Sequence, residues 1–406
     1  MSGFHSTYPG GRDTARAMLG GLRTVPALAD RYSDLVALDS LEDLVHVPVM
    51  FKEDLNIALD HLQPRAHEGA TWMFQSGGTT GSPQLGFAPS GLYMSEVHDQ
   101  WKPIGPDDLF VNGWSAGRMW GGHYLVSAYA DLTGCTGIGL GAVGRAEYDA
   151  WLDFFAKRRV TSFGGAPSTL RQLFGHARET GVKLPDLRTV LWLGEGWHPQ
   201  LDEDIPAVAP NARRWGLYGS TETWVIATNT PDCPDDTWHP LPSQLVHIGP
   251  DQLIDFTSLK PHGLNPVLRY QTGDAGEWVV CRCGEPGPAL RLLGRRDGIV
   301  LFRGFGLDVD ATIGDLSVQP GVSRIQLRMT TFETRLDHLE ILVVPARDAA
   351  SDLAERLRAH ILSGGFGPGV LFQNDPSSFE VRLIDAAITN ERTGKSANLI
   401  RLKDES

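Results

Sequence analysis

The sequence predicts an α/β protein: a large N-terminal domain in which helices and β-sheets form several layers, followed by a small α+β C-terminal domain. Before residue 290, stretches with helical spacing alternate with short apolar runs, which is the pattern of sheets covered by helices. The composition shifts near residues 293–298, and the part beyond has about a hundred residues, a usual size for a domain. We therefore predict one domain of residues 1–296 and a second of residues 297–406.

The predicted elements of the first domain follow in chain order. Residues 41–55 indicate a helix, a proline break and a second helix start, and residues 69–74 indicate a strand that leads into a glycine-rich loop. Residues 148–158 and 167–180 have the apolar spacing of helices. Residues 187–196, LRTVLWLGEG, form an apolar run closed by glycines, which is typical of a buried strand in a parallel sheet.

The second domain has a simpler pattern. Residues 338–345 and 379–385 are predicted strands, and residues 351–362 between them are a predicted helix with Leu353 and Leu357 on one face. This order of strand, helix and strand predicts one compact α+β unit.

Composition and charge exclude several classes of protein. Hydrophobic residues make up 41% and charged residues 21%, as in soluble globular proteins. Lys and Arg number 36 against 49 Asp and Glu, a net charge of −13 without a basic cluster, which argues against nucleic-acid binding. No apolar run approaches the roughly 20 residues that span a bilayer, and the N-terminus lacks the order of a signal peptide. We expect a cytoplasmic protein whose cysteines are reduced and better suited to metal binding than to disulfides.

Residues 76–84 read SGGTTGSPQ and are the most informative stretch for function. Glycines let the backbone turn its N–H groups toward an anion, and Ser and Thr add hydroxyl donors that suit phosphate oxygens. The loop therefore predicts a polyphosphate ligand, and the alternative is a flexible surface loop. The residues expected to hold phosphate are Ser76, Gly77, Gly78, Thr79, Thr80 and Gly81.

Four further motifs follow this loop in a fixed order. They are WGLYGSTETW at 215–224, LRYQTGDAGEW at 268–278, LLGRRDGIVLFRGFG at 292–306 and ERTGKS at 391–396. Together with the loop they resemble the adenylate-forming superfamily of acyl-CoA synthetases, adenylation domains and luciferases. The phenylacetate-CoA ligase branch is the most similar, because VPVMFKEDL precedes the loop, CRCG precedes GRRDG, and RGF follows it.

The resemblance implies a ligase that joins a carboxylate to the α-phosphate of ATP and releases pyrophosphate. Positioning and electrostatic stabilisation supply most of the acceleration of such a reaction. The glycine-rich loop would hold the β- and γ-phosphates. Gln84 stands where the family usually has Lys, and the missing cation puts the rate of adenylation in doubt.

The same resemblance assigns roles to the YGSTE segment. Glu222 matches the family's Mg²⁺ ligand, since a carboxylate suits a hard cation that also touches phosphate. Tyr218 would stack on adenine, Thr221 would reach the α-phosphate, and Gly219 and Ser220 complete the nucleotide-binding turn. The alternative for Glu222 is a solvated surface acid.

Further roles fall on the later motifs. Asp274 resembles the carboxylate that binds both ribose hydroxyls, although Thr-Gly-Asp is also good turn chemistry. Arg295 resembles an arginine that contacts ribose. Asp297 occupies the position of a hinge about which the small, mobile C-terminal domain rotates between two half-reactions. Lys395 resembles the catalytic lysine that reaches the α-phosphate and the carboxylate.

The family places its acid pocket near residues 113–123, 163–167 and 192–197. Aromatic side chains beside glycines predict flat walls for a planar, aromatic acid, although some of the tryptophans would simply fill the core. Arg118 could orient the carboxylate or a ring substituent, as could His123. The residues expected to contact the substrate are Trp120, His123, Gly194 and Trp224.

Three cysteines and one histidine indicate a structural zinc site. Cys281 and Cys283 form a C-x-C pair after the TGD motif, while Cys233 and His239 follow the YGSTETW motif. The alternatives are free thiols beside an unrelated histidine, or a fourth ligand taken from His247 or His262. We expect Cys135 to be a small buried residue.

The leading hypothesis is therefore an AMP-forming ligase, with ATP, Mg²⁺ and a structural Zn²⁺, that activates an aryl or arylalkyl carboxylic acid in secondary metabolism. The acyl group would pass to a thiol, with coenzyme A as the first choice. Alternatives are a carrier-protein thiol, an amine, or nitrite chemistry in an aryl diazotase. A nucleotide-binding protein without ligase activity is a different class, and a luciferase-like oxidation is a third. The protein would be a monomer or a homodimer.

Overall fold

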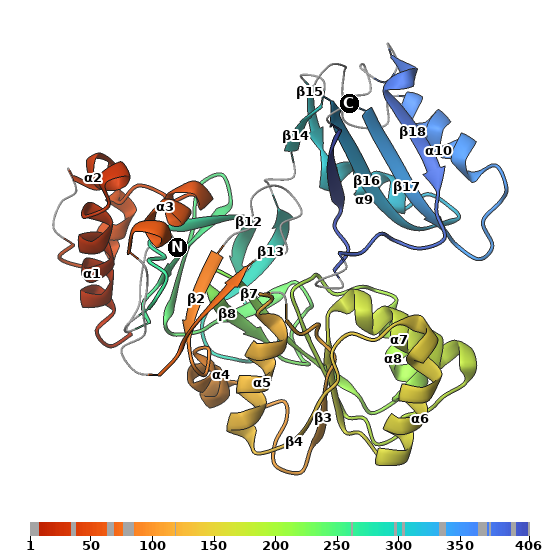
Figure 1. The fold of residues 1–406 in the computed structure, drawn as a ribbon, viewed down its shortest axis with the longest axis horizontal. Helices are drawn as coiled ribbons and strands as arrows, with labels where there is room; N and C mark the ends of the chain where they lie inside the picture. Colours follow the sequence, from red (N-terminus) through yellow and green to blue (C-terminus); the bar gives the residue numbers. More distant parts are fainter. Residues whose placement is uncertain are drawn as a thin grey trace. The chain divides into compact units, whose positions relative to one another are not determined.

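The computed structural model describes residues 8–33, 38–62, 69–75, 85–117, 119–260, 263–295, 299–302, 305–332, 338–363, 372, 375–390 and 395–404 (Figure 1). The chain divides into two compact units. The described residues of the first unit lie before Arg295, and those of the second run from Arg295 to the C-terminal strand. Among the described residues, no helix is both long and apolar enough to cross a membrane.

The chain begins with a small group of helices in the first unit. Ala15, Leu19 and Leu22 recur at helical spacing and bury one face of the first helix. The predicted helix, proline break and second helix of residues 41–55 are confirmed, with the first helix a short 3₁₀ helix and the second an α-helix. The elements are α1 (Gly11–Arg23), α2 (Pro26–Ser33), η1 (Glu42–His46) and α3 (Lys52–Leu62).

A large sheet of 11 strands forms the body of the first unit, in the order β10-β11-β12-β13-β9-β8-β7-β6-β5-β3-β4. Neighbouring strands from β4 to β7 are parallel, and β7 pairs with β8 in antiparallel fashion. The strands are β3 (Leu109–Asn112), β4 (Thr136–Gly139), β5 (Ser162–Gly165), β6 (Thr189–Leu193), β7 (Arg213–Ser220), β8 (Trp224–Asn229), β9 (Thr237–Pro240), β10 (Gln244–Ile248), β11 (Leu253–Ser258), β12 (Tyr270–Val279) and β13 (Ala289–Arg295).

Helices cover both faces of the parallel part of this sheet (Figure 1). Side chains alternate between the faces, so that Phe110 and Leu191 pack with α4 and α5, whereas Val111 and Val190 pack with α6, α7 and α8. The predicted buried parallel strand is confirmed as β6, and both predicted helices are confirmed as α6 and α7. The helices are α4 (Met94–Gln100), α5 (Gly122–Thr133), η2 (Arg145–Glu147), α6 (Tyr148–Arg158), α7 (Pro167–Thr180) and α8 (Leu201–Val208).

A separate antiparallel hairpin flanks the glycine-rich stretch. Strand β1 (Thr71–Gln75) pairs with β2 (Leu85–Pro89), and Gln75 lies opposite Leu85 at the end of the ladder. The hairpin therefore brings together Gln75 and Leu85, the residues on either side of the glycine-rich stretch 76–84.

The second unit is the predicted α+β fold. Its four-stranded sheet has the order β18-β17-β16-β19, with β16 and β17 antiparallel and the outer strands parallel to their neighbours. Leu353, Leu357 and Ile361 of its last helix are buried in a core of their own, as the spacing predicts. The elements are β14 (Ile299–Phe302), β15 (Phe305–Asp308), α9 (Val309–Ser317), β16 (Val322–Phe332), β17 (His338–Pro345), α10 (Leu353–Leu362), η3 (Pro376–Ser378), β18 (Phe379–Leu383) and β19 (Leu399–Asp404).

Candidate functional site

The turn between β7 and β8 carries the YGSTE motif, and its backbone packs tightly against β2. A Cβ placed on Gly86 would lie 2.1 Å from the Thr221 carbonyl oxygen, and one on Gly219 would lie 1.9 Å from the Trp224 carbonyl oxygen. Neither position has room for a side chain. The strand that follows the glycine-rich loop is therefore in direct backbone contact with the predicted nucleotide-binding turn. Residues 76–84, including the six predicted phosphate-binding residues and Gln84, lie outside the described residues.

Glu222 is only 9% exposed and is held by side chains from distant parts of the chain. Its Oε1 accepts a hydrogen bond from the Tyr270 hydroxyl at 3.0 Å. Its carbonyl oxygen accepts one from Asn265 Nδ2 at 2.7 Å. The alternative of a solvated surface acid is therefore wrong, because burial and fixed partners define the orientation of this carboxylate.

Asn265 also connects this turn to the strand after the glycine-rich loop. Its Oδ1 accepts a hydrogen bond from the Phe87 amide at 2.8 Å, and Trp224 Nε1 donates to the Phe87 carbonyl at 2.9 Å. Trp224 has a φ of 61°, a strained conformation for a bulky residue that these contacts maintain. No local sequence pattern indicates the role of Asn265, because its side chain acts on partners far away in the chain.

The structure brings Tyr218 and Asp274 together. The Tyr218 hydroxyl donates to Asp274 Oδ2 at 2.5 Å, and Thr272 Oγ1 donates to the same oxygen at 3.0 Å. Asp274 N in turn donates to Thr272 Oγ1 at 3.2 Å, and Gly273 has a φ of 85°, so the turn chemistry is present as well. Two residues predicted to bind the nucleoside thus lie side by side.

Other predicted nucleotide residues are less fully described. Ser220 Oγ and Thr223 Oγ1 are 2.8 Å apart and close the turn around Thr221. The backbone of Arg295 ends β13, but its side chain is outside the described residues, as is Asp297. Lys395 belongs to the second unit, where its carbonyl oxygen accepts a hydrogen bond from the Asn390 amide at 2.7 Å.

The predicted substrate residues lie near the carboxyl ends of the parallel strands. Trp224 packs edge-on against Phe74, with ring centroids 5.3 Å apart, and Gly194 follows β6 with a φ of 89°. Trp120 is 5% exposed and its ring covers Gly122. It therefore fills the core, which is the alternative that the sequence left open for some of the tryptophans. His123 lies in the first turn of α5 and is half-buried. Arg118 lies outside the described residues.

Lys260 is a site feature that sequence reasoning missed. It borders a cavity of about 10 Å³, large enough for one water molecule, together with Glu222 and Trp224. Burial lowers the pKa of Lys260 to about 8, although Glu96 opposes this shift. Within the described chain its Nζ has no hydrogen-bond partner and lies 5.6 Å from the centroid of the Tyr93 ring. The sequence around Lys260, which precedes a proline, contains no pattern that predicts burial of this side chain.

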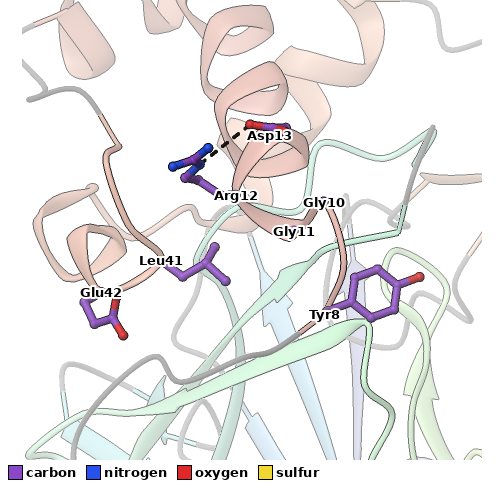
Figure 2. Close-up of a pocket in the computed structure, with 7 residues that line it drawn as sticks. All are labelled: Tyr8, Gly10, Gly11, Arg12, Asp13, Leu41 and Glu42. Atoms are coloured by element: carbon purple, nitrogen blue, oxygen red, sulfur yellow. Dashed lines mark ion pairs between the residues drawn. The ribbon is translucent and has the colours of Figure 1, made fainter.

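A larger pocket of about 320 Å³ lies elsewhere, at the start of α1 (Figure 2). Arg12 and Asp13 form an ion pair of 3.7 Å at this pocket. None of the predicted site residues is among its lining residues, which are Tyr8, Gly10, Gly11, Arg12, Asp13, Leu41 and Glu42.

The predicted metal ligands come together as a group. The ligand atoms of Cys233, His239, Cys281 and Cys283 all lie within 4.8 Å of one another, and Cys283 Sγ is 3.2 Å from His239 Nε2. Three sulfurs and one imidazole nitrogen form the donor set of a structural zinc site, whose ligands lie about 2.0–2.3 Å from the metal. The residues present therefore fit a tetrahedral Zn²⁺.

Burial at this cluster keeps the Cys283 thiol neutral unless a cation is bound. Burial raises the pKa of the Cys283 thiol to about 12, and contact with Cys281 and Cys233 raises it too. Three thiolates in one buried group need a positive charge between them, and a bound metal deprotonates its thiols.

Two cysteine and histidine predictions need correction. His247 is not a substitute ligand, because it is not part of the group of ligand atoms that Cys233, His239, Cys281 and Cys283 form. Its Nδ1 pairs with Asp255 Oδ1 at 2.8 Å. Cys135 is half-buried instead of fully buried, since it follows α5 near the surface. His262 lies outside the described residues.

Comparison with known proteins identifies the class. The family described as "AMP-binding enzyme" matches residues 29–252, more than half of the chain, and the protein belongs to this family. No curated protein sequence matches the chain.

Solved structures show the same fold. A 2-hydroxyisobutyryl-CoA ligase in its postadenylation state, in complex with 2-HIB-AMP, has a TM-score of 0.67 and 17% identity, over 96% of this chain and 88% of that one. The same ligase with 2-HIB-AMP and CoA, in its thioesterification state, has a TM-score of 0.58 and 19% identity, over 98% and 91%. ATP-bound MatB from Rhodopseudomonas palustris has a TM-score of 0.56 and 17% identity, over 81% and 66%.

Proposed function

We propose that the protein is an AMP-forming ligase that activates a small aryl or arylalkyl carboxylic acid as its acyl-adenylate and releases pyrophosphate. The observation that carries this proposal is the buried Glu222, fixed by Tyr270 and Asn265 on a turn that packs against the strand leaving the glycine-rich loop. A protein that only binds a nucleotide, and catalyses no reaction, does not need a carboxylate held in one fixed orientation. Membership of the AMP-binding enzyme family supports the same reading.

In this proposal the residues of the first unit bind and orient the two reactants. The glycine-rich loop holds the β- and γ-phosphates, Asp274 accepts from the ribose hydroxyls, and Tyr218 stacks on adenine. Glu222 would hold Mg²⁺, which neutralises phosphate charge when bound. Thr221 lies one residue earlier and would donate to the α-phosphate. Orientation for in-line attack then supplies much of the acceleration.

Two parts of the proposal concern the second domain. Lys395 would bring its ammonium to the α-phosphate during adenylation, and the second domain would turn about Asp297 before the acyl group leaves. The acceptor we propose is the thiol of coenzyme A. The solved CoA ligases of the same fold support this choice over an amine or a carrier protein.

The Cys233, His239, Cys281 and Cys283 cluster is proposed to hold a structural Zn²⁺. Its donor set and closed geometry are those of a structural site, in which every position around the metal is taken by protein. It would not take part in the reaction.

The experiment that tests the function is acid-dependent exchange of labelled pyrophosphate into ATP. The panel contains phenylacetates, benzoates, hydroxy- and aminobenzoates, cinnamates and amino acids, with nitrite as a separate sample. Exchange with an aryl acid, followed by thioester formation with coenzyme A, is the expected result. Exchange with nitrite alone would identify a diazotase, and silence with every acid despite ATP binding would refute ligase activity on this class.

A further inference from the structure

His123 lies where the order of the parallel strands reverses. Strand β3 has β4 on one side and β5 on the other, and α5 with His123 in its first turn follows β3 directly. In open α/β sheets, ligands bind outside the carboxyl ends of the strands at such a switch point. The position of His123 therefore places it at the expected ligand crevice of this sheet.

A hydrogen-bond network fixes the imidazole in one orientation. Asn112, at the end of β3 and 3% exposed, accepts from the Trp114 amide at 3.3 Å. Its Nδ2 donates to the His123 carbonyl and to Ser127 Oγ, both at 3.0 Å. His123 Nδ1 lies 2.8 Å from the Trp114 carbonyl oxygen. The buried amide of Asn112 thus holds the backbone of both Trp114 and His123, the two residues whose contact orients the imidazole ring. Supporting residues act in this way at functional sites.

This contact also decides which ring nitrogen carries the proton. A carbonyl oxygen only accepts, so Nδ1 is the donor, and Nε2 of the neutral ring keeps its lone pair as an acceptor. No described residue provides a hydrogen bond to Nε2. The nearest atoms to a Cβ built on Gly139 are Nε2, at 3.8 Å, and Cε1 of His123. A Cβ on Gly137 of β4, or on Gly141 just after β4, would meet no atom within 4 Å, so these two glycines leave open space at this end of the strand.

The first turn of α5 is packed against the adenylate-forming turn. A Cβ on Gly121 would lie 3.4 Å from the Trp224 ring, and Trp224 is only two residues from Glu222. An acyl group that extends from the nucleotide site past Trp224 therefore runs toward the helix turn that holds His123.

We infer that His123 Nε2 accepts a hydrogen bond from the acid substrate, so the protein selects acids that carry a hydroxyl or amino group on the ring or side chain. This inference rests on the proposed function and names the substrate class within it. An acid without a donor leaves the fixed acceptor unpaired, and sites built around such a hydrogen bond reject analogues that lack it far more strongly than apolar pockets reject a missing methylene.

The test compares matched acids in the pyrophosphate-exchange assay. Benzoates and phenylacetates with a hydroxyl or amino group at each ring position are compared with their methoxy and unsubstituted counterparts. For the wild type we expect kcat/KM to be about tenfold or more higher for at least one donor-bearing acid than for its methoxy counterpart. His123→Phe should bring this ratio close to one, because the rate with donor-bearing acids falls more than the rate with the unsubstituted acid. His123→Gln, which keeps an acceptor, should restore part of the preference.

Two further variants separate this role from a structural one. Gly139→Ala adds a methyl beside Nε2 and should reduce the rate with donor-bearing acids only, since it hinders their access to this nitrogen. The variant should fold normally, because Gly139 has no left-handed φ that alanine would strain. His176→Phe removes a histidine that pairs with Asp149 on α6 and should leave the preference intact. A wild type that exchanges with all acids equally would overturn the inference and leave the ligase function standing. Equal loss with every acid in His123→Phe, with a lowered melting temperature, would assign His123 to folding. Absence of exchange with any acid would overturn both proposals.

Discussion

Glu222 and Lys260 border the same small cavity, but only the charged group of Glu222 has a hydrogen-bond partner among the described residues. Glu222 has a hydroxyl donor on its carboxylate and an amide on its carbonyl, so its burial is compensated. Lys260 Nζ has no hydrogen-bond partner in the described chain, and its charge is favoured by the Tyr93 ring and by Glu96. The lysine is therefore a source of instability that the fold tolerates next to its proposed metal ligand.

We expect Lys260→Met to raise the free energy of unfolding at pH 7 by up to about 3 kcal/mol, because it removes the desolvation of a buried ammonium. Burial lowers the pKa of Lys260 from 10.5 to about 8 in the folded protein. Between these pH values the unfolded chain binds more protons than the folded one, so the stability of the wild type should rise with pH across this window.

Urea unfolding at pH 7 and at pH 10 measures this effect. The gap in stability between Lys260→Met and the wild type should shrink at the higher pH. Lys157→Met, which removes an exposed lysine paired with Asp153, serves as the control and should show no such change. A gap that is independent of pH would contradict the assignment.

At the scale of elements, the Cys and His cluster ties two connections together. Cys233 lies between β8 and β9, His239 lies on β9, and both other cysteines lie between β12 and β13. Strands β9 and β13 pair with each other, so a metal would fix the ends of two connections around one antiparallel contact. A bound metal would thereby anchor β13, the strand that leads out of the first unit.

We expect the purified wild type to contain about one zinc per chain, and Cys281→Ser to lose it. Loss of a structural metal should lower the melting temperature by about 5 °C or more, because the free energy of metal binding contributes to folding. Cys135→Ser changes a half-buried thiol outside the cluster and should retain the zinc. Metal analysis and thermal unfolding decide the matter, and a metal-free wild type would refute the proposal.

At the scale of the whole molecule, the chain is divided so that each unit has its own hydrophobic core. The proposed nucleotide residues Tyr218, Glu222 and Asp274 all belong to the first unit, whereas Lys395 belongs to the second. This division suits an enzyme whose catalytic lysine serves one half-reaction only.

We expect Lys395→Ala to reduce pyrophosphate exchange by about 100-fold, since it removes a cation from the developing charge. ATP binding and thioester formation from a preformed acyl-adenylate should both remain close to wild type. Arg401→Ala, a change on β19, is the matched control. If ATP affinity falls as much as exchange does, the lysine contributes uniform binding and not transition-state stabilisation.

Local patterns in the sequence predicted a large part of this protein. Helical spacing predicted α6, α7 and α10, and an apolar run between glycines predicted β6, because these patterns depend on neighbours in the chain. The Cys and His residues were also predicted as one group, since zinc sites have recognisable ligand types and spacings.

Only the tertiary structure decided how individual side chains are placed. Tyr270 and Asn265 reach Glu222 across 48 and 43 residues of sequence, and Lys260 is buried by segments that no local pattern connects to it. His247 pairs with Asp255 and lies outside the metal-ligand group, and the carbonyl of Trp114 makes Nδ1 the donor nitrogen of His123. Periodicity and residue type specify which elements form, whereas burial, hydrogen-bond partners and protonation arise only when distant segments pack together.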